Sequence, residues 1–265
     1  MIFKREFKRN IKSLLIWSIV LGGLVLMMLS VYPQFAKDKA ALNELLKAYP
    51  ESMKNAFGMD KLNFGTVMGF YGVEIYVMTT LIGSIYAAIM ASNIIAKESN
   101  DKTIEFLLSK PVSRSEIIFQ KLLAVTVNII LLNAVIVLVS VIGFQFAENE
   151  QVPVKAFVLI STATFLLHMT FAAISFLLSA IMRKTRNILS ISMGIVFVEY
   201  FFHIMSGVTD KLKNLQYVSV FSYVDASEII SNNAMETLYV IIMTAIIIIC
   251  FGSAFIVYKK KDITV

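Results

Sequence analysis

Six stretches of the chain are apolar over a length that can cross a lipid bilayer as a helix, which takes about 20 residues. They run from about residue 14 to 32, 67 to 96, 122 to 146, 154 to 182, 188 to 205 and 238 to 257. The runs are continuous, whereas the strands of a membrane β-barrel alternate apolar and polar residues. The pattern therefore predicts an all-α polytopic membrane protein with six transmembrane helices in a single domain over residues 1–265.

The first apolar stretch follows basic residues, as the core of a signal peptide does. It is longer than the usual signal-peptide core of about 7–15 residues, and five further stretches follow it. We therefore expect it to be retained as the first transmembrane helix.

The composition supports a membrane protein and excludes several other classes. Hydrophobic residues make up 58% of the chain and charged residues 16%, against about 45–50% and about 25% in soluble domains. This apolar content excludes a disordered chain. The single cysteine, Cys250, excludes a disulfide scaffold, and with only two histidines we expect no metal site.

The positive charges indicate which ends of the helices face the cytoplasm. Sixteen of the 24 lysines and arginines lie beside the ends of the apolar stretches, in residues 1–12, 97–121, 183–186 and 259–261. Short basic segments stay on the cytoplasmic side of a membrane. We therefore expect both termini in the cytoplasm and residues 33–66 and 208–235 outside. A bacterial plasma membrane fits the Lys- and Ile-rich composition and the absence of Asn-X-Ser/Thr acceptor sites.

Residues 1–12 combine basic and apolar positions at helical spacing. Phe3, Phe7 and Ile11 recur at intervals of four residues, and lysines and arginines occupy most of the positions between them. Such a pattern is typical of an amphipathic helix that lies in the membrane interface. We expect an interfacial elbow helix here, followed by the first span.

The connection between the second and third spans has the most specific pattern in the chain. A short helix over residues 100–110 would carry Ile104, Leu107 and Leu108 on one side and would end at Pro111. Ser113 and Glu116 form a capping box that starts the third span. Charged residues surround the apolar side, namely Glu98, Asp101, Glu105 and Arg114. An exposed apolar ridge with a charged rim favours a docking surface, although a solvated turn explains the same residues equally well.

Three ionisable residues within the predicted spans are the other candidates for function. Glu199 lies about 16 Å along the fifth span, near the bilayer midplane, and His203 follows on the same helical face, within hydrogen-bonding reach. Glu74 lies in the second span, nearer its outer end. Such residues face the interior of a helix bundle. They fit either a substrate path or proton relay, or a polar cluster that fixes helix packing.

Several catalytic motifs are absent from the sequence. It contains no Gly-Lys dipeptide, and therefore no Walker A loop for ATP hydrolysis. It also lacks the HExxH motif of metalloproteases and the GxSxG elbow of hydrolases. We therefore expect a transport subunit without its own ATPase site, rather than an enzyme, and no catalytic residues.

The connection also carries a family resemblance. The residues concerned are Glu98, Thr103, Ile104, Glu105, Leu107, Leu108, Ser109, Pro111, Val112, Ser113 and Arg114, with Lys121 entering the third span. This run, the opening FKREFKRN and the closing Phe255, Tyr258 and Lys259 to Asp262 resemble the permeases of ABC-2 type transporters, which are membrane subunits of ABC exporters. One departure is Lys102, which stands where the family usually has glycine.

The resemblance implies a specific assembly. Two permease copies, as a homodimer or with a close paralogue, would pair with two copies of a separate P-loop ATP-binding subunit. Residues 97–115 would be the coupling segment, with the 100–110 helix docked on that subunit. The subunit would bind ATP and Mg, while this chain would bind no cofactor and no nucleic acid. Similar permeases export amphipathic peptides such as phenol-soluble modulins, and we expect an amphipathic peptide or a hydrophobic drug-like substrate.

A different mechanism remains open from the residues alone. A proton-coupled secondary transporter would use Glu74, Glu199 and His203 and would need no ATPase. Its transport would collapse with an uncoupler and survive ATP depletion. The sequence shows no inverted repeat and no pair of short, broken spans, which many such transporters have.

Overall fold

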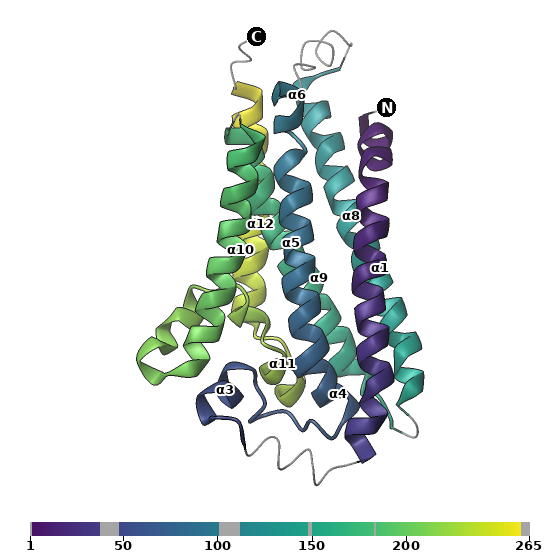
Figure 1. The fold of residues 1–265 in the computed structure, drawn as a ribbon. Helices are drawn as coiled ribbons and strands as arrows, with labels where there is room; N and C mark the ends of the chain where they lie inside the picture. Colours follow the sequence, from purple (N-terminus) through teal and green to yellow (C-terminus); the bar gives the residue numbers. More distant parts are fainter. Residues whose placement is uncertain (1, 38–47, 101–111, 148–149, 183, 261–265) are drawn as a thin grey trace.

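The computed structural model describes residues 2–37, 48–100, 112–147, 150–182 and 184–260. Six long helical stretches cross from one end of the molecule to the other (Figure 1). They comprise α1 (Ile2–Lys37), α4 with a π-helical turn and α5 (Val67–Asn93), α8 with a 3₁₀ turn (Arg114–Phe146), α9 (Val154–Ile181), α10 (Thr185–Val208) and α12 (Thr237–Lys260). Shorter elements join them, namely α3 (Glu51–Ala56), α6 (Ala96–Asn100), a 3₁₀ helix (Asp210–Tyr217), a 3₁₀ turn (Ser222–Val224) and α11 (Ala226–Asn232).

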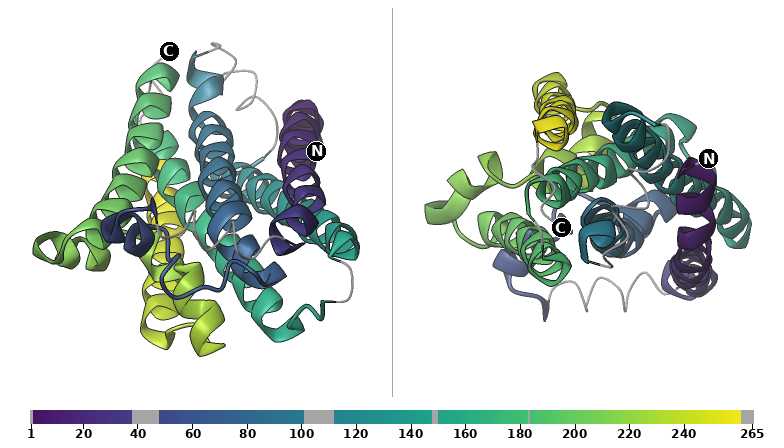
Figure 2. Two further views of the ribbon diagram at one scale, coloured as in Figure 1. Left: turned by 60° about the horizontal axis from the view of Figure 1, so that its bottom comes forward. Right: turned by 90° about the horizontal axis from the view of Figure 1, so that it is seen from above.

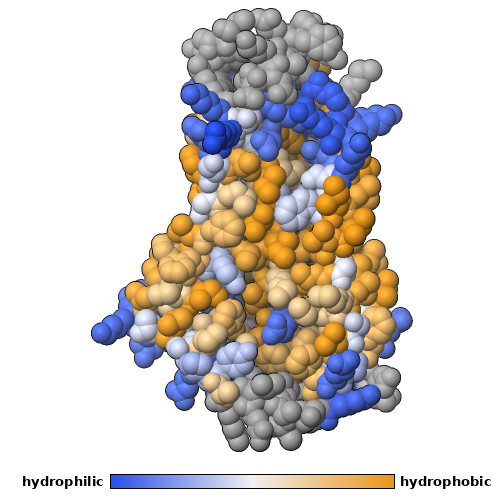
Figure 3. Space-filling model, viewed as in Figure 1, coloured by the Kyte–Doolittle hydropathy of each residue, from blue (hydrophilic) through white to orange (hydrophobic). Residues whose placement is uncertain are grey.

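The predicted fold class is confirmed. All six helices are long and apolar enough to cross a membrane, and the described residues contain no β-strand. On the face shown in Figure 3, an apolar belt crosses the middle of the molecule, with hydrophilic residues toward both ends. Most of the observed helices extend a few residues beyond the predicted stretches, because polar residues continue a helix after the apolar run has ended.

The helices pack around α5 and α9, which have the largest buried fractions. The helix α1 packs along α8, whereas α5 and α12 pack along α9, and α10 packs on α5 (Figure 2). The buried side chains form two clusters, one of which includes Val25, Phe70 and Phe171, while the other includes Leu21, Tyr86 and Phe176. Large exposed apolar residues cover the outer faces of α1, α8 and α12, as a bilayer-facing surface requires.

The first turn of α1 and the last turn of α12, which contains Lys259 and Lys260, lie at the same end of the bundle, which we call the basic end (Figure 1). It carries the first turns of α1, the helix α6 and the beginnings of α8 and α10. The opposite, distal end carries α3, α4 and α11. The short helix α3 begins directly after Pro50.

The beginning of the chain differs from the sequence-based expectation. Residues from Ile2 onward form the first turns of the continuous helix α1, so the described part of the chain has no separate elbow helix. No glycine or proline interrupts the chain before Gly22, so nothing in the sequence forces a break. In addition, Glu6 is buried against α6 and α8 and holds these turns to the bundle. The buried residues of these turns are Ile2 and Glu6, whereas Ile11 of the predicted apolar face is exposed.

Gly83 provides a test of the central packing between α5 and α9. A Cβ atom at Gly83 would lie 2.3 Å from two ring atoms of His168, which is fully buried. We expect Gly83→Ala to lower the free energy of unfolding by about 1–3 kcal/mol, because the tight site has to rearrange. Unfolding of the purified protein in mixed micelles with increasing SDS measures this change.

The matched control is Gly194→Ala in α10, since a Cβ atom there meets no other group within 4 Å. Alanine favours helix more than glycine by about 1 kcal/mol, so this variant should unfold no more easily than the wild type. Equal stability of the two variants would contradict the packing described for Gly83.

Candidate functional site

Four charged side chains are buried together at the basic end. They come from three helices, namely Glu6 of α1, Lys97 and Glu98 of α6, and Lys121 of α8. Their exposed fractions are 1%, 7%, 4% and 0%. We call these four residues the charge cluster. Burial of a charge is unfavourable unless an opposite charge and hydrogen bonds compensate it, so two acids and two bases at one place require mutual pairing.

The ion pairs of the charge cluster join all three helices. Lys121 Nζ lies 2.6 Å from Glu98 Oε1 and 3.5 Å from Glu6 Oε1. Lys97 Nζ donates to Glu6 Oε2, and Lys121 Nζ also donates to the carbonyl of Ile94. Arg5, which is half exposed, adds a contact of 3.2 Å to Glu98. Burial and the nearby Lys121 lower the pKa of Lys97, while Glu6 acts in the opposite direction.

Backbone contacts fix the position of the charge cluster. The chain bends between α5 and α6, and Ser179 Oγ of α9 accepts hydrogen bonds from the backbone N–H groups of Ile95 and Ala96, both at 3.1 Å. The backbone N–H of Phe3 donates to Gln120 Oε1 at 3.0 Å, which is a second link between α1 and α8. The start of α8 is capped by Ser113, whose Oγ accepts from the N–H of Glu116 as predicted. The carboxylate of Glu116, which would close the predicted capping box, accepts a hydrogen bond from the side-chain amide of Gln120.

The structure changes the interpretation of the predicted docking residues. Glu98 was expected on the exposed rim, but its side chain is buried and paired with Lys121. Arg114 remains near the surface, where its guanidinium donates to the carbonyl of Lys259 at 3.2 Å. The other predicted docking residues lie outside the described residues, namely Asp101, Thr103, Ile104, Glu105, Leu107, Leu108 and Pro111.

A cavity of about 520 Å³ opens at the distal end, and we call it the distal cavity. It lies between α3, α10, the 3₁₀ segments that follow α10, α11 and the start of α12. Its charged lining residues are Asp60, Lys61, Asp210, Lys213, Asp225, Glu228 and Glu236. Lys61 Nζ pairs with Glu228 at 2.6 Å, which raises the pKa of Lys61. Tyr223 and Tyr239, whose rings stack at 4.6 Å, form an aromatic part of its wall.

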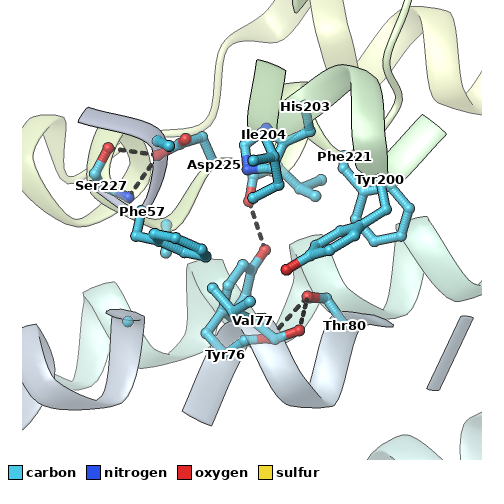
Figure 4. Close-up of a pocket in the computed structure, with 14 residues that line it drawn as sticks. Phe57, Tyr76, Val77, Thr80, Tyr200, His203, Ile204, Phe221, Asp225 and Ser227 are labelled. Carbon is cyan, nitrogen blue, oxygen red and sulfur yellow. Dashed lines mark hydrogen bonds between the residues drawn. The ribbon is translucent and has the colours of Figure 1, made fainter. Parts of the chain in front are cut away.

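A narrower pocket of about 30 Å³ adjoins the distal cavity and shares Ala56, His203 and Asp225 with it. This deep pocket lies between α5 and α10, and its lining is mainly aromatic and apolar (Figure 4). Tyr76 donates to the carbonyl of Val224 at 2.7 Å and so joins α5 to the segment before α11.

The three ionisable residues predicted within the spans do not form one chain. Glu199 Oε2 accepts from the backbone N–H of Val220 at 2.9 Å, and the Glu199 carbonyl accepts from Ser219. His203 Nδ1 pairs with Ser222 Oγ at 3.0 Å, not with Glu199. Residues 219–222 fold back against α10 and provide these partners. Only His203 lines the distal cavity, whereas Glu74 lies in the π-helical turn Tyr71–Ile75.

Sequence reasoning missed most of the charge cluster. Glu6 is the single acid among five bases in residues 1–12, and Lys121 lies in the third turn of an apolar helix. Each of these residues differs in charge or polarity from its neighbours in the sequence, and this difference was the signal that could have identified it. Among the described residues, no group of three or more His, Cys, Asp or Glu side chains is placed to hold a metal ion.

The six membrane-crossing helices and the two polar ends define a multi-pass membrane protein. The family described as ABC-2 family transporter protein matches residues 1–263, so the chain belongs to this family. It is accordingly a membrane subunit of an ABC transporter, and the family implies a partner subunit that binds ATP. Among curated proteins, none matches the sequence.

Proposed function

We propose that this chain is the membrane-spanning subunit of an ATP-driven exporter that moves an amphipathic peptide or a hydrophobic drug-like substrate outward. Two permease copies would assemble with two copies of the ATP-binding subunit, which would dock on residues 100–110. The basic end would face the cytoplasm of a bacterial cell and the distal end the outside, in agreement with the positive-inside rule. This chain would bind no cofactor, since ATP and Mg would belong to the partner.

The observation that supports the substrate class is the mixed lining of the distal cavity. Its wall combines charged side chains with the stacked rings of Tyr223 and Tyr239. A ligand with a polar and an apolar face would satisfy both parts of this wall at once, whereas a small inorganic ion would leave the aromatic part without a partner. The structure therefore favours an amphiphile over an ion.

The experiment compares energy sources in vesicles that contain the permease together with its ATPase. We expect export of a fluorescent amphipathic helical peptide to stop when ATP is withheld and to continue when an uncoupler removes the proton gradient. The vesicles without the ATPase are the control for leakage. Export that stops with the uncoupler and survives ATP depletion would contradict the proposal and would support the proton-coupled alternative.

Two substitutions of Glu199 distinguish a role of this residue in packing from a role in proton transfer. Its carboxylate accepts a hydrogen bond from a backbone N–H, and the amide oxygen of glutamine can accept the same bond. We therefore expect Glu199→Gln to retain most of the ATP-driven export, and Glu199→Ala to lose more of it because residues 219–222 lose an anchor. Export of the labelled peptide measures both. Loss of export in Glu199→Gln, with normal assembly, would indicate that proton transfer at Glu199 is required.

A further inference from the structure

The charge cluster occupies a special place along the chain. The helix α6 contains Lys97 and Glu98 and ends at Asn100, directly before residues 101–111. The helix α8 begins at Arg114, directly after that connection, and carries Lys121. Glu98 and Lys121 therefore join the chain that enters the connection to the chain that leaves it, through an ion pair of 2.6 Å.

The third partner, α1, is far from the connection in sequence but is tied to both of its sides. Glu6 contacts Lys97 on the entering side and Lys121 on the leaving side. Because all four side chains are almost fully buried, water does not screen these contacts as it screens a surface ion pair. A displacement of α6 or α8 at this level has to move Glu6, or leave a buried charge without its partner.

We propose that Glu6, Lys97, Glu98 and Lys121 are positioning residues that transmit movement of the connection to the transmembrane helix α1. The inference rests on the proposed function, in which the ATP-binding subunit acts on residues 100–110. It adds that the movement reaches α1 through these buried ion pairs rather than through the membrane surface. Packed groups with discrete pairings are suited to this role, because they move together or separate.

The charge cluster links α1 to both sides of the connection, whereas other polar contacts in the bundle link fewer elements or lie elsewhere. The link from Phe3 to Gln120 joins only α1 and α8, and the pair between Lys61 and Glu228 is exposed at the distal end. Neither of them connects α1 to both sides of the connection. Gln120→Ala serves as the control, because it removes a polar contact between α1 and α8 without opening the proposed route.

The test measures movement of α1 in the assembled complex. Spin labels are placed on the exposed residues Lys8 of α1 and Asn187 of α10, in a Cys250→Ala background, and the permease is purified with its ATPase into lipid nanodiscs. The distance distribution between the labels is recorded without nucleotide and after trapping with ATP and orthovanadate. We expect a shift in the wild type, loss of most of this shift in Glu6→Gln, and an unchanged shift in Gln120→Ala. ATPase binding and ATP hydrolysis should persist in all three proteins.

Each outcome has a defined meaning. A full shift in Glu6→Gln, or no shift in a wild-type complex that hydrolyses ATP, overturns this inference and leaves the proposed function intact. A wild-type permease that retains no ATPase overturns the proposed function, and the inference with it. If Glu6→Gln does not fold, Lys97→Gln removes the ion pair of Glu6 with the entering side and leaves its contact with Lys121 in place. A reduced shift in Lys97→Gln supports the proposal, and a full shift contradicts the proposal.

Discussion

Replacement of Lys121 by methionine is expected to lower the free energy of unfolding by about 3–5 kcal/mol, because it removes the buried cation that contacts both carboxylates of the charge cluster. Lys121 is fully buried and contacts Glu98, Glu6 and the carbonyl of Ile94. Methionine fills a similar volume, so the loss reports the charge and its hydrogen bonds rather than a cavity. Unfolding in mixed micelles with increasing SDS measures the change.

The matched control for this prediction is Lys61→Met at the distal end. Lys61 has the same side chain and a similar ion pair, 2.6 Å from Glu228, but both partners are about half exposed. Exposed pairs contribute about 0–1 kcal/mol, so this variant should unfold close to the wild type. Equal stability of Lys121→Met and Lys61→Met would contradict the burial and pairing described for the charge cluster.

The second large effect concerns assembly. Leu107→Asp is expected to reduce the amount of ATPase retained by the permease at least about tenfold, because it places a charge on the predicted apolar ridge of the connection. The ridge is a sequence-based prediction, since Leu107 lies outside the described residues. Quantitative immunoblots of the purified complex measure the ratio of the two subunits.

The control variant is Met53→Asp in α3, which makes a comparable change on an exposed apolar residue at the opposite end of the molecule. It should retain the ATPase at the wild-type ratio. A wild-type ratio in Leu107→Asp as well would show that residues 100–110 do not form the docking surface.

The fold was largely predictable, because the bilayer imposes a simple rule on the sequence. A backbone in lipid has to satisfy its own hydrogen bonds, so long apolar runs become helices. The runs near residues 154–182 and 238–257 therefore matched α9 and α12 closely. The bend at Ile94 and Ile95 was not predicted, since Ser179 of α9, which stabilises it, lies far away in the sequence.

The partners of the charged residues were harder to predict, because they depend on contacts between distant segments. Glu98 and Arg114 were both predicted on the charged rim of the docking surface. In the structure only Glu98 is buried, next to Lys121 and Glu6. Glu199 and His203 are four residues apart on one helix, and local spacing suggested a contact between them. Residues 219–222 fold back against α10 and form hydrogen bonds with both side chains instead. No pattern in the sequence of α10 predicts these contacts.

We expect this chain to act as the membrane subunit of a complex powered by a separate ATPase. The most direct measurement is a pull-down of the tagged chain from native membranes in mild detergent, followed by mass spectrometry of the retained proteins. We expect a P-loop ATPase at about one copy per permease. Recovery of the chain alone, while a known membrane complex remains intact under the same conditions, would contradict this expectation.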